Sequence, residues 1–527
     1  MKKYVSLFLA IIMALSLVAC GGGTKEDAPA PEAETPTPEQ QIESGEATYA
    51  ETVYIGSFKD LDGVDPFCTT GPVVSFYTNA TFCPLVKMNT ATGELVGVLA
   101  ESWEDVNGDG TVWRVNLKDG VKYHDGSMLD AGDVKFTWEY AKDPTNVVKV
   151  IANADKMVKE VVVEDDLTVR FDLNSPIPDF MTYLELKIYS KEAFDSMPLE
   201  EAVGIGCGPY KVGEIVSGVS FAMDRFDDYF EGIDNYPTKT FVFKAYTETT
   251  SIISALQAGE IDYAMDVPSS AYNTLKADSN ITIHEAPGCM SYYVGITGRK
   301  EVWQDVRMRQ ALAKAINKDD IINVFFEGGI GATRSENFCV PTGAGYDPNV
   351  KAVDFDLEGA KALLAECGKE GQEVKIMVSS ANKVMAEVIQ ANLNAAGFTA
   401  VIDLVDVANW GELKKTGDYD IFCGDYCSYA GALLYNFDRF FSVGGTSNFY
   451  EFESAEFAAA LEKVRACTTY EDMIKEFSNL QVWVAENVPL IPVAVSVAQV
   501  ATASNVGGVV VAPSKNLMEV ATLFKTE

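Results

Sequence analysis

Strands and helices alternate along residues 373–423, and this alternation limits the possible folds more than any other feature of the chain. The predicted elements are strands at 373–378, 399–405 and 419–423 and helices at 382–396 and 407–416, the helices ending at Gly397 and Gly417. Strands that alternate with helices form a parallel sheet with helical crossovers. We therefore expect an α/β fold in which the segment after Cys423 faces any bound ligand, because ligands bind beyond the carboxyl ends of such strands.

The length of the chain predicts more than one hydrophobic core. Residues after Ala50 have the composition of a globular protein, with aromatic residues throughout. That part is about 480 residues long, and domains seldom grow beyond about 250 to 300 residues before they split. We therefore expect at least two lobes.

The first twenty residues have the pattern of a bacterial lipoprotein signal. Lys2 and Lys3 precede a short apolar run at 5–18, and the run leads to Cys20 and three glycines. We expect residues 1–19 to be a removed signal peptide, and Cys20 to carry a lipid that anchors the chain to the outer face of the bacterial cell membrane. A plain secretory signal with a chance cysteine is the alternative. Residues 20–50 are the lipidated cysteine and a disordered linker rich in Pro, Ala, Glu and Thr.

The composition argues against several kinds of partner and cofactor. A formal net charge of −36 does not suit nucleic acid, which needs a basic surface, and it opposes self-association, so we expect a monomer. Of the ten cysteines, nine remain besides Cys20, an odd number without paired spacing, so no disulfide framework is predicted. With only His124 and His284 in the chain, Cys423 and Cys427 lack the partners of a zinc site. We expect no metal and no other cofactor.

Several short patterns imitate catalytic or ligand-binding loops without their context. Residues 105–110 copy the first half of an EF-hand loop, but the acidic residue at its twelfth position is missing, and a hairpin turn is the better interpretation. The glycines at 204–208 and 328–331 lack the strand, loop and helix order of a phosphate loop. No Gly-x-Ser-x-Gly elbow positions a serine nucleophile. His124 is expected to be a turn or packing residue.

Two helices are expected to belong to the scaffold. Residues 306–316 have one apolar face, formed by Val306, Ala311, Leu312 and Ala315. The arginines of this helix are therefore expected to face solvent. Asp130 is predicted to cap the helix that carries Val134 and Phe136.

Four longer stretches follow one another in a recognisable order. They are 99–136, with Gly-Thr-Val-Trp-Arg-Val and Tyr-His-Asp-Gly; 206–230, with Gly-Cys-Gly-Pro-Tyr; 253–262; and 306–319. Together they resemble the family 5 extracellular solute-binding proteins, the oligopeptide, dipeptide and nickel receptors of ABC importers. The resemblance covers residues from about 51 to 510.

The resemblance implies a hinged, two-lobed fold like that of periplasmic binding proteins, with a discontinuous first lobe and an inserted subdomain. The implied divisions are lobe I at 51–85, 189–283 and 495–527, the insertion at 86–188, and lobe II at 284–494. The implied function is that of a receptor, not an enzyme, which captures a solute, in the first place a short peptide, and delivers it to the permease subunits of an ABC importer.

Other functions remain open at this point. The receptor is compatible with a non-peptide solute, such as a sugar, an opine or a metal chelate, and with a role as a sensor. A surface hydrolase is a further alternative. It would need two carboxylates about 5 to 9.5 Å apart, or a nucleophile with a base, and the sequence shows no such local group.

The resemblance also implies candidate ligand-binding residues. Peptide-binding members carry an aspartate after the strand that corresponds to 419–423, and this aspartate pairs with the α-amino group of the ligand. Asp425 matches it in one register, whereas a shift by a few residues leaves Ala or Gly there, and the usual second Asp-Pro is absent. Aromatic rings that can stack on peptide, sugar or ring ligands complete the set. They are Trp410, Tyr426, Tyr429, Tyr292, Tyr293, Phe76 and Tyr77.

Overall fold

The computed structural model describes residues 48–58, 61, 63–67, 72–89, 94–142, 157–428, 433–513 and 521–527. Residues 47–527 form one compact unit, and the fold described below is the fold of that unit. Cys20, nearly all of the predicted signal and linker, and Tyr429 lie outside the described residues. Within the described residues, no helix is both long enough and apolar enough to cross a bilayer.

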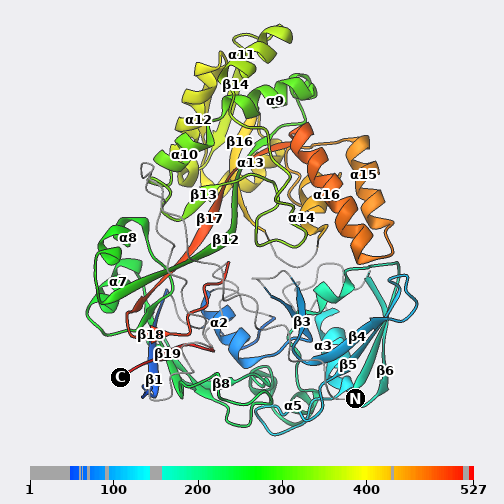
Figure 1. Cartoon of the computed structure of the whole chain (residues 1–527), viewed down its shortest axis with the longest axis vertical. Coiled ribbons are helices and arrows are strands. Elements are labelled where there is room, and N and C mark those ends of the chain that lie inside the picture. The colour runs from blue at the N-terminus through cyan, green and yellow to red at the C-terminus, as the bar shows by residue number, and fades with distance from the viewer. Residues whose placement is uncertain are drawn as a thin grey trace, which may run out of the picture. The chain divides into compact units, whose positions relative to one another are not determined.

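Two long strands, β12 (Ile281–Ile296) and β17 (Leu490–Ala503), run through both lobes (Figure 1). They pair antiparallel from one end to the other, so that one large sheet continues across the molecule in the order β15-β14-β16-β12-β17-β11-β1-β10-β9-β8. The predicted lobe limits at 283/284 and 494/495 fall inside these two strands. The two-lobed fold is therefore built on a shared pair of strands, and the domain limits themselves stay a prediction.

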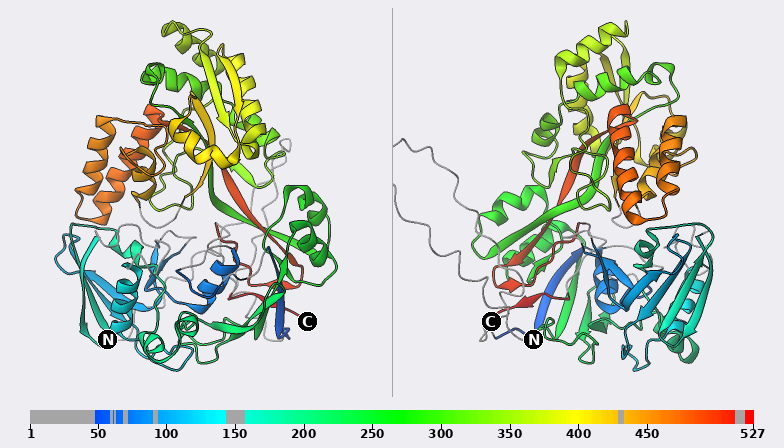
Figure 2. Two further views of the ribbon diagram at one scale, coloured as in Figure 1. Left: turned by 180° about the vertical axis from the view of Figure 1, so that it is seen from behind. Right: turned by 45° about the vertical axis from the view of Figure 1, so that its right-hand side comes forward.

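The second lobe is a three-layer sandwich. Its remaining strands are β13 (Ala332–Arg334), β14 (Glu373–Val378), β15 (Thr399–Leu404) and β16 (Ile421–Cys427). Its helices are η2 (Glu301–Trp303), α9 (Val306–Ala315), α10 (Lys318–Val324), α11 (Leu357–Glu366), η3 (Ser380–Asn382), α12 (Lys383–Ala395), η4 (Val407–Asn409), α13 (Trp410–Thr416), α14 (Tyr435–Phe441), α15 (Ala455–Arg465) and α16 (Tyr470–Asn487). Helices α9 to α12 share one core with the sheet, and α14 to α16 share another (Figure 2). Alternate residues of each strand feed the two cores, as the strand period of two requires.

The first lobe contains the other end of the large sheet. Its strands are β1 (Thr52–Phe58), β8 (Tyr210–Val216), β9 (Ser220–Arg225), β10 (Thr240–Tyr246) and β11 (Tyr263–Ala264), and its helices are α2 (Pro72–Thr81), α7 (Thr249–Gln257) and α8 (Ser269–Lys276). β1 pairs in parallel with β10 and β11, whereas β8, β9 and β10 are antiparallel. The short strands β18 (Val506–Gly507) and β19 (Phe524–Lys525) pair with each other near the end of the chain.

A separate four-stranded antiparallel sheet, in the order β4-β5-β7-β6, lies within the predicted insertion. The elements of this region are β2 (Val86–Met88), β3 (Leu95–Gly97), β4 (Ala100–Asp105), β5 (Val112–Leu117), α3 (Ala131–Lys142), β6 (Val158–Asp165), β7 (Thr168–Leu173), η1 (Phe180–Leu184), α5 (Lys191–Ser196) and α6 (Leu199–Ala202). β4 and β5 form the predicted hairpin, and the carboxylate of Asp105 accepts hydrogen bonds from the N–H groups of Gly108 and Gly110 in its turn. The residues that imitate an EF-hand loop are thus turn residues.

Other scaffold predictions are confirmed by specific contacts. Asp130 Oδ1 accepts the N–H groups of Gly132 and Asp133, so it caps α3 as expected. His124 packs against a phenylalanine, and its Nε2 lies 2.9 Å from the carbonyl oxygen of Gly208. Burial lowers the pKa of His124 to about 4. Gly206 and Gly208 press directly against the backbone at the end of α2, which leaves no room for a Cβ, so these glycines serve close packing.

The prediction for the arginines of helix α9 is wrong for one of them. Arg307 is exposed and pairs with Asp305, but Arg309 is only 9% exposed. The guanidinium of Arg309 donates to the backbone carbonyl oxygens of Trp303, Gln304 and Asn487. A buried guanidinium is tolerated when its donors are satisfied in this way, and the apolar pattern of a helix does not reveal such acceptors.

Candidate functional site

Asp425 lies where two adjacent parallel strands reach their carboxyl ends. β14 and β16 pair in parallel, and η3 follows β14 and ends at Asn382. Asn382 Nδ2 donates a hydrogen bond to Asp425 Oδ1 at 3.2 Å. Asn382 is buried, whereas Asp425 is exposed. One oxygen of the carboxylate is therefore held by a fixed amide, and the other, Oδ2, has no hydrogen-bond partner among the described residues.

β16 is longer than the sequence predicted. The expected strand ended at Cys423, but the observed strand continues to Cys427 because it pairs with β12 up to Met290. Asp425 is consequently a strand residue and lies directly opposite Tyr292. The pairing of β12 with β16 joins segments far apart in the chain, so the alternation of local elements could not place this strand end.

The charge of Asp425 acts on the groups around it. Burial raises the pKa of the half-buried Tyr292, and the charge of Asp425 raises it further. Burial lowers the pKa of Lys414, and the charge of Asp425 acts in the opposite direction. Lys414 Nζ lies 4.1 Å from the ring centroid of Phe449 and 5.6 Å from that of Trp410. The charge of Asp425 thus acts on the phenol of Tyr292 and on the ammonium group of Lys414.

The structure separates the predicted aromatic residues into two groups. Phe76, Tyr77, Tyr293 and Tyr426 are buried in hydrophobic cores. The hydroxyl of Tyr77 donates to the carbonyl oxygen of Val64, and that of Tyr426 donates to the carbonyl oxygen of Phe338. This placement does not favour direct ligand contact, and we leave these four residues out of the proposed binding set. Tyr292 is partly exposed opposite Asp425, with its ring against Phe325 and Phe326, whereas the partly exposed Trp410 packs against Phe422. Tyr429 lies outside the described residues.

A small polar gap lies just beyond the end of β16. Its lining includes Ser428, Asn436, Cys339 and the ring of Tyr426. Asn436 Nδ2 donates to Ser428 Oγ at 3.0 Å, while its buried Oδ1 has no partner among the described residues. Neither Asn382 nor Asn436 is predicted as a site residue from the sequence, because an amide carries no motif. The available signal for Asn382 is its place at the start of the predicted helix 382–396, just beyond the predicted strand 373–378.

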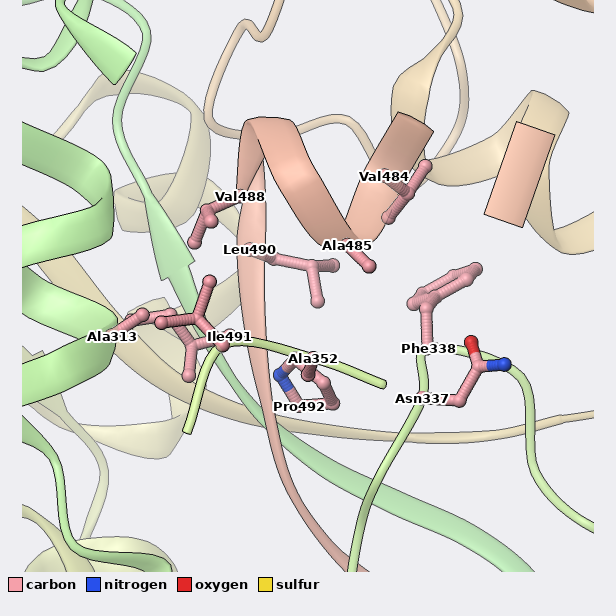
Figure 3. A pocket seen from close by; sticks show the side chains of 11 residues that line it. Ala313, Asn337, Phe338, Ala352, Val484, Ala485, Val488, Leu490, Ile491 and Pro492 are labelled. Atoms are coloured by element: carbon pink, nitrogen blue, oxygen red, sulfur yellow. The ribbon is translucent and has the colours of Figure 1, made fainter. Parts of the chain in front are cut away.

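A second pocket lies inside the second lobe, between α16 and β17 (Figure 3). Its lining is apolar except for Asn337, whose Nδ2 already donates to Gln481 Oε1 at 2.9 Å. Figure 3 shows Val484, Ala485 and Leu490 among the side chains that line this space. We assign it to core packing, because it offers a solute no polar group that is not already bonded.

The arrangement of acids, cysteines and histidines can be stated for the described residues. The described residues contain no group of three or more His, Cys, Asp or Glu side chains arranged to hold a metal ion. His284 Nε2 lies 3.0 Å from Thr502 Oγ1, and His124 is bonded to Gly208, so both histidines of the chain have structural partners.

Asp179 lies where the inserted subdomain approaches the second lobe. Asp179, which precedes η1, is buried, its Oδ2 has no hydrogen-bond partner among the described residues, and the backbone N–H of Leu433 only partly offsets the effect of burial on its pKa. Burial raises the pKa of Asp179 to about 6. The charge of Asp179 also contributes to the raised pKa values of Tyr183 and Tyr470. Titratable groups from the two parts of the molecule therefore meet at this contact.

Comparison with known proteins agrees with this architecture. The model of the middle region of the bacterial extracellular solute-binding proteins, family 5, matches residues 94–448. The chain is 27% identical over 507 residues to the dipeptide-binding protein of Escherichia coli, and this match covers 88% of the chain and 93% of the relative. It is also 27% identical over 469 residues to heme-binding protein A of Haemophilus influenzae, covering 81% of the chain and 84% of the relative.

A solved structure has the same fold. HbpA2 from Haemophilus parasuis superposes with a TM-score of 0.80 at 24% sequence identity, and the match covers 90% of this chain and all of that one. At this level of identity the likeness concerns the arrangement of lobes and strands.

Proposed function

The chain belongs to the bacterial extracellular solute-binding proteins of family 5, and from this premise we propose that it captures a short peptide between its two lobes for an ABC importer. Proteins of this family work outside the cytoplasm. The observation that carries the proposal is the exposed carboxylate of Asp425, fixed by the buried amide of Asn382 at the carboxyl ends of β14 and β16. We propose that this carboxylate pairs with the α-amino group of the peptide.

The chemistry of the site suits an ammonium ligand. A positive charge that leaves water needs an anionic partner, since an unpaired buried charge is costly. Asp425 Oδ2 has no hydrogen-bond partner among the described residues and can accept from an ammonium group, while Asn382 keeps Oδ1 in place. Tyr292, directly opposite Asp425 in the ladder, supplies a partly exposed ring beside it, and such rings pack against the backbone and side chains of a peptide.

A non-peptide solute is the second candidate, because one relative is named for binding heme. Heme iron in proteins is most often held by histidine, cysteine, methionine or tyrosine side chains. Both histidines of this chain are already bonded within the scaffold, so heme iron would need a cysteine, methionine or tyrosine ligand instead. Absorption spectra after addition of hemin decide this point: a new Soret band on the parent chain would support the second candidate.

Binding itself needs no covalent step in this proposal. A ligand that contacts both lobes stabilises the closed arrangement by its differential affinity for that state. The long strands β12 and β17 connect the lobes and are the elements about which such closure takes place. We further propose that the permease subunits of the importer recognise the closed form, and that a lipid on Cys20 keeps the receptor at the outer face of the cell membrane.

The test compares free and N-acetylated peptides. A melting screen over di- to hexapeptides first identifies the best binder, which should raise the midpoint by several degrees. Calorimetry of that peptide and of its N-acetylated form should then show much weaker binding of the acetylated form to the parent chain. In Asp425→Asn, which keeps an acceptor for Asn382, the free peptide should lose on the order of 100-fold in affinity, about 3 kcal/mol.

The control variant is Glu387→Gln on α12, which removes one exposed acid from the same lobe. It should bind the free peptide like the parent. Equal binding of free and acetylated peptides would remove Asp425 from the site. A complete lack of response to peptides in the melting screen would contradict a peptide ligand altogether.

A further inference from the structure

Two cysteines that are 138 residues apart in the chain meet at the junction between β12 and β16. Cys289 Sγ lies 2.6 Å from Cys427 Sγ. This separation is shorter than two sulfur atoms approach without a bond, and longer than an S–S bond of about 2.05 Å. Cys289 is buried and Cys427 is half-buried. The two side chains therefore occupy the positions that a disulfide partner pair needs.

The backbone holds this juxtaposition in place. Cys427 is the last residue of β16 and pairs with Met290, the neighbour of Cys289. The N–H of Ser428 donates to the carbonyl oxygen of Cys289, and the N–H of Cys289 donates to the carbonyl oxygen of Pro513. Three independent segments thus fix the backbone around the two thiols.

An irregularity in β12 explains how Cys289 reaches its partner. In a regular strand, neighbours such as Cys289 and Met290 point to opposite faces of the sheet. The register of β12 against β17 shifts between Pro287 and Ser291, and the hydroxyl of Ser496 fills the bulge by accepting the N–H of Met290. A bulge re-aims a side chain in this manner. Cys289 lies within this shift, so the alternation of a regular strand does not keep its side chain away from Cys427.

We infer that Cys289 and Cys427 form an intramolecular disulfide when the protein meets a disulfide-bearing oxidant. One cysteine thiolate attacks the S–S bond of the oxidant and expels one thiol, and the other cysteine then displaces the second thiol from the mixed disulfide. The two cysteines lose two electrons and two protons in total, and the oxidant disulfide gains them as two thiols. Proteins outside the cytoplasm are exposed to such oxidants, and the family of this chain is extracellular.

The bond has a defined mechanical consequence. It ties the end of the strand that carries Asp425 to one of the two strands shared by the lobes. It also closes a long loop of the unfolded chain, and a disulfide stabilises the folded state more when the loop that it closes is longer. The oxidised protein should therefore melt a few degrees above the reduced protein.

The experiment uses the purified full chain after incubation with excess glutathione disulfide or with a reducing agent. Protease digestion without reduction, followed by mass spectrometry, should recover one cross-linked species that joins the peptides containing Cys289 and Cys427 and is lighter by two hydrogens. Reduction should remove it and lower the melting midpoint by a few degrees. Recovery of both cysteines as alkylated thiols after oxidation would overturn the inference, and so would a link from Cys427 to Cys339 instead.

Variants separate this bond from other cysteine chemistry. Cys427→Ser and Cys289→Ser should each abolish the redox-dependent change in melting midpoint. Cys367→Ser, at the half-buried end of α11, removes a cysteine elsewhere in the second lobe and should leave that change intact. A redox-dependent midpoint that persists in Cys427→Ser would contradict the assignment. The peptide map of the parent chain decides the question even if Cys289→Ser does not fold.

Discussion

Tyr292 of β12 lies directly opposite Asp425 of β16 in the antiparallel ladder that joins the shared strand to the second lobe. Directly opposite residues project from the same face of a sheet, so the phenol and the carboxylate share one face at the strand ends. The negative charge of Asp425 disfavours the tyrosinate and adds to the effect of burial on the pKa of Tyr292. The proposed ligand anchor is thus coupled to a group whose titration can be followed.

The first prediction uses this coupling. Asp425→Asn should lower the pKa of Tyr292, because the variant removes the negative charge but not the burial. The measurement is the tyrosinate absorbance of parent and variant as the pH is raised. Tyr293 responds to Asp425 in the same direction, so both proteins should also be titrated in the Tyr292→Phe background. If Asp425→Asn shifts the tyrosinate titration as much in the Tyr292→Phe background as in the parent, Asp425 is not coupled to Tyr292.

The second prediction concerns the buried guanidinium in α9. Arg309→Leu should destabilise the protein by on the order of 3 kcal/mol or more, because three backbone carbonyl oxygens lose a charged donor in a buried place. Denaturant unfolding measures the loss. The matched control is Arg307→Leu in the same helix, whose exposed ion pairs with Asp305 and Glu366 should contribute less than about 1 kcal/mol. A similar loss in both variants would show that helix propensity, rather than buried hydrogen bonding, sets the effect.

The second lobe shows which structural features sequence patterns can predict and which they cannot. The predicted strand at 373–378 and the predicted helix at 382–396 match β14 and α12 to within a residue, because both depend on local periodicity and on the turn residue Gly397. The end of β16, the burial of Arg309 and the contact of Cys289 with Cys427 depend on segments far apart in the chain. Local patterns carry no information about those partners.

The candidate site, too, could be predicted from the sequence only where a local pattern was sufficient. The rule that ligands bind at the carboxyl ends of parallel strands pointed to the neighbourhood of Asp425 from the sequence. The prediction of Tyr293 and Tyr426 rests on residue type alone, and type does not distinguish a ring in a core from a ring at a surface. The sequence contains no comparable indication for Asn382, since its contribution is a single hydrogen bond across two strand ends.

The third prediction follows from the raised pKa of Asp179. Its pKa is about 6 in the folded protein against an ordinary 3.8, so the folded state binds the proton more tightly than the unfolded state. The contribution of this group to stability is therefore fully present below about pH 4 and is lost as the pH rises through about 6. Asp179→Asn should remove that loss and be more stable than the parent at pH 7, by about 3 kcal/mol at most, with little difference at pH 4.

Denaturant unfolding of parent and variant between pH 4 and pH 8 checks this prediction. Asp133 has a similarly raised pKa of about 6, but it is present in both proteins and cancels in the difference. The side chain of the variant has nearly the same shape and keeps an oxygen that can face the N–H of Leu433, so the packing at this place should be kept. A difference between the two proteins that does not change with pH would contradict the assignment to Asp179.

The fourth prediction concerns Cys20, the residue proposed to carry the lipid. Cys20→Ala should prevent attachment of the diacylglyceryl group, because the thiol is its acceptor, and the protein should be released from the membrane or remain unprocessed. The folded part should be unaffected, since residues 47–527 form a compact unit by themselves. Membrane fractionation of cells that express parent and variant, together with the intact mass of each product, measures both effects. Ser16→Ala, which changes the apolar run but keeps the thiol, is the control and should stay attached. Full retention of the Cys20→Ala protein on membranes, with cleavage at another position, would show that something other than a lipid on Cys20 holds it there.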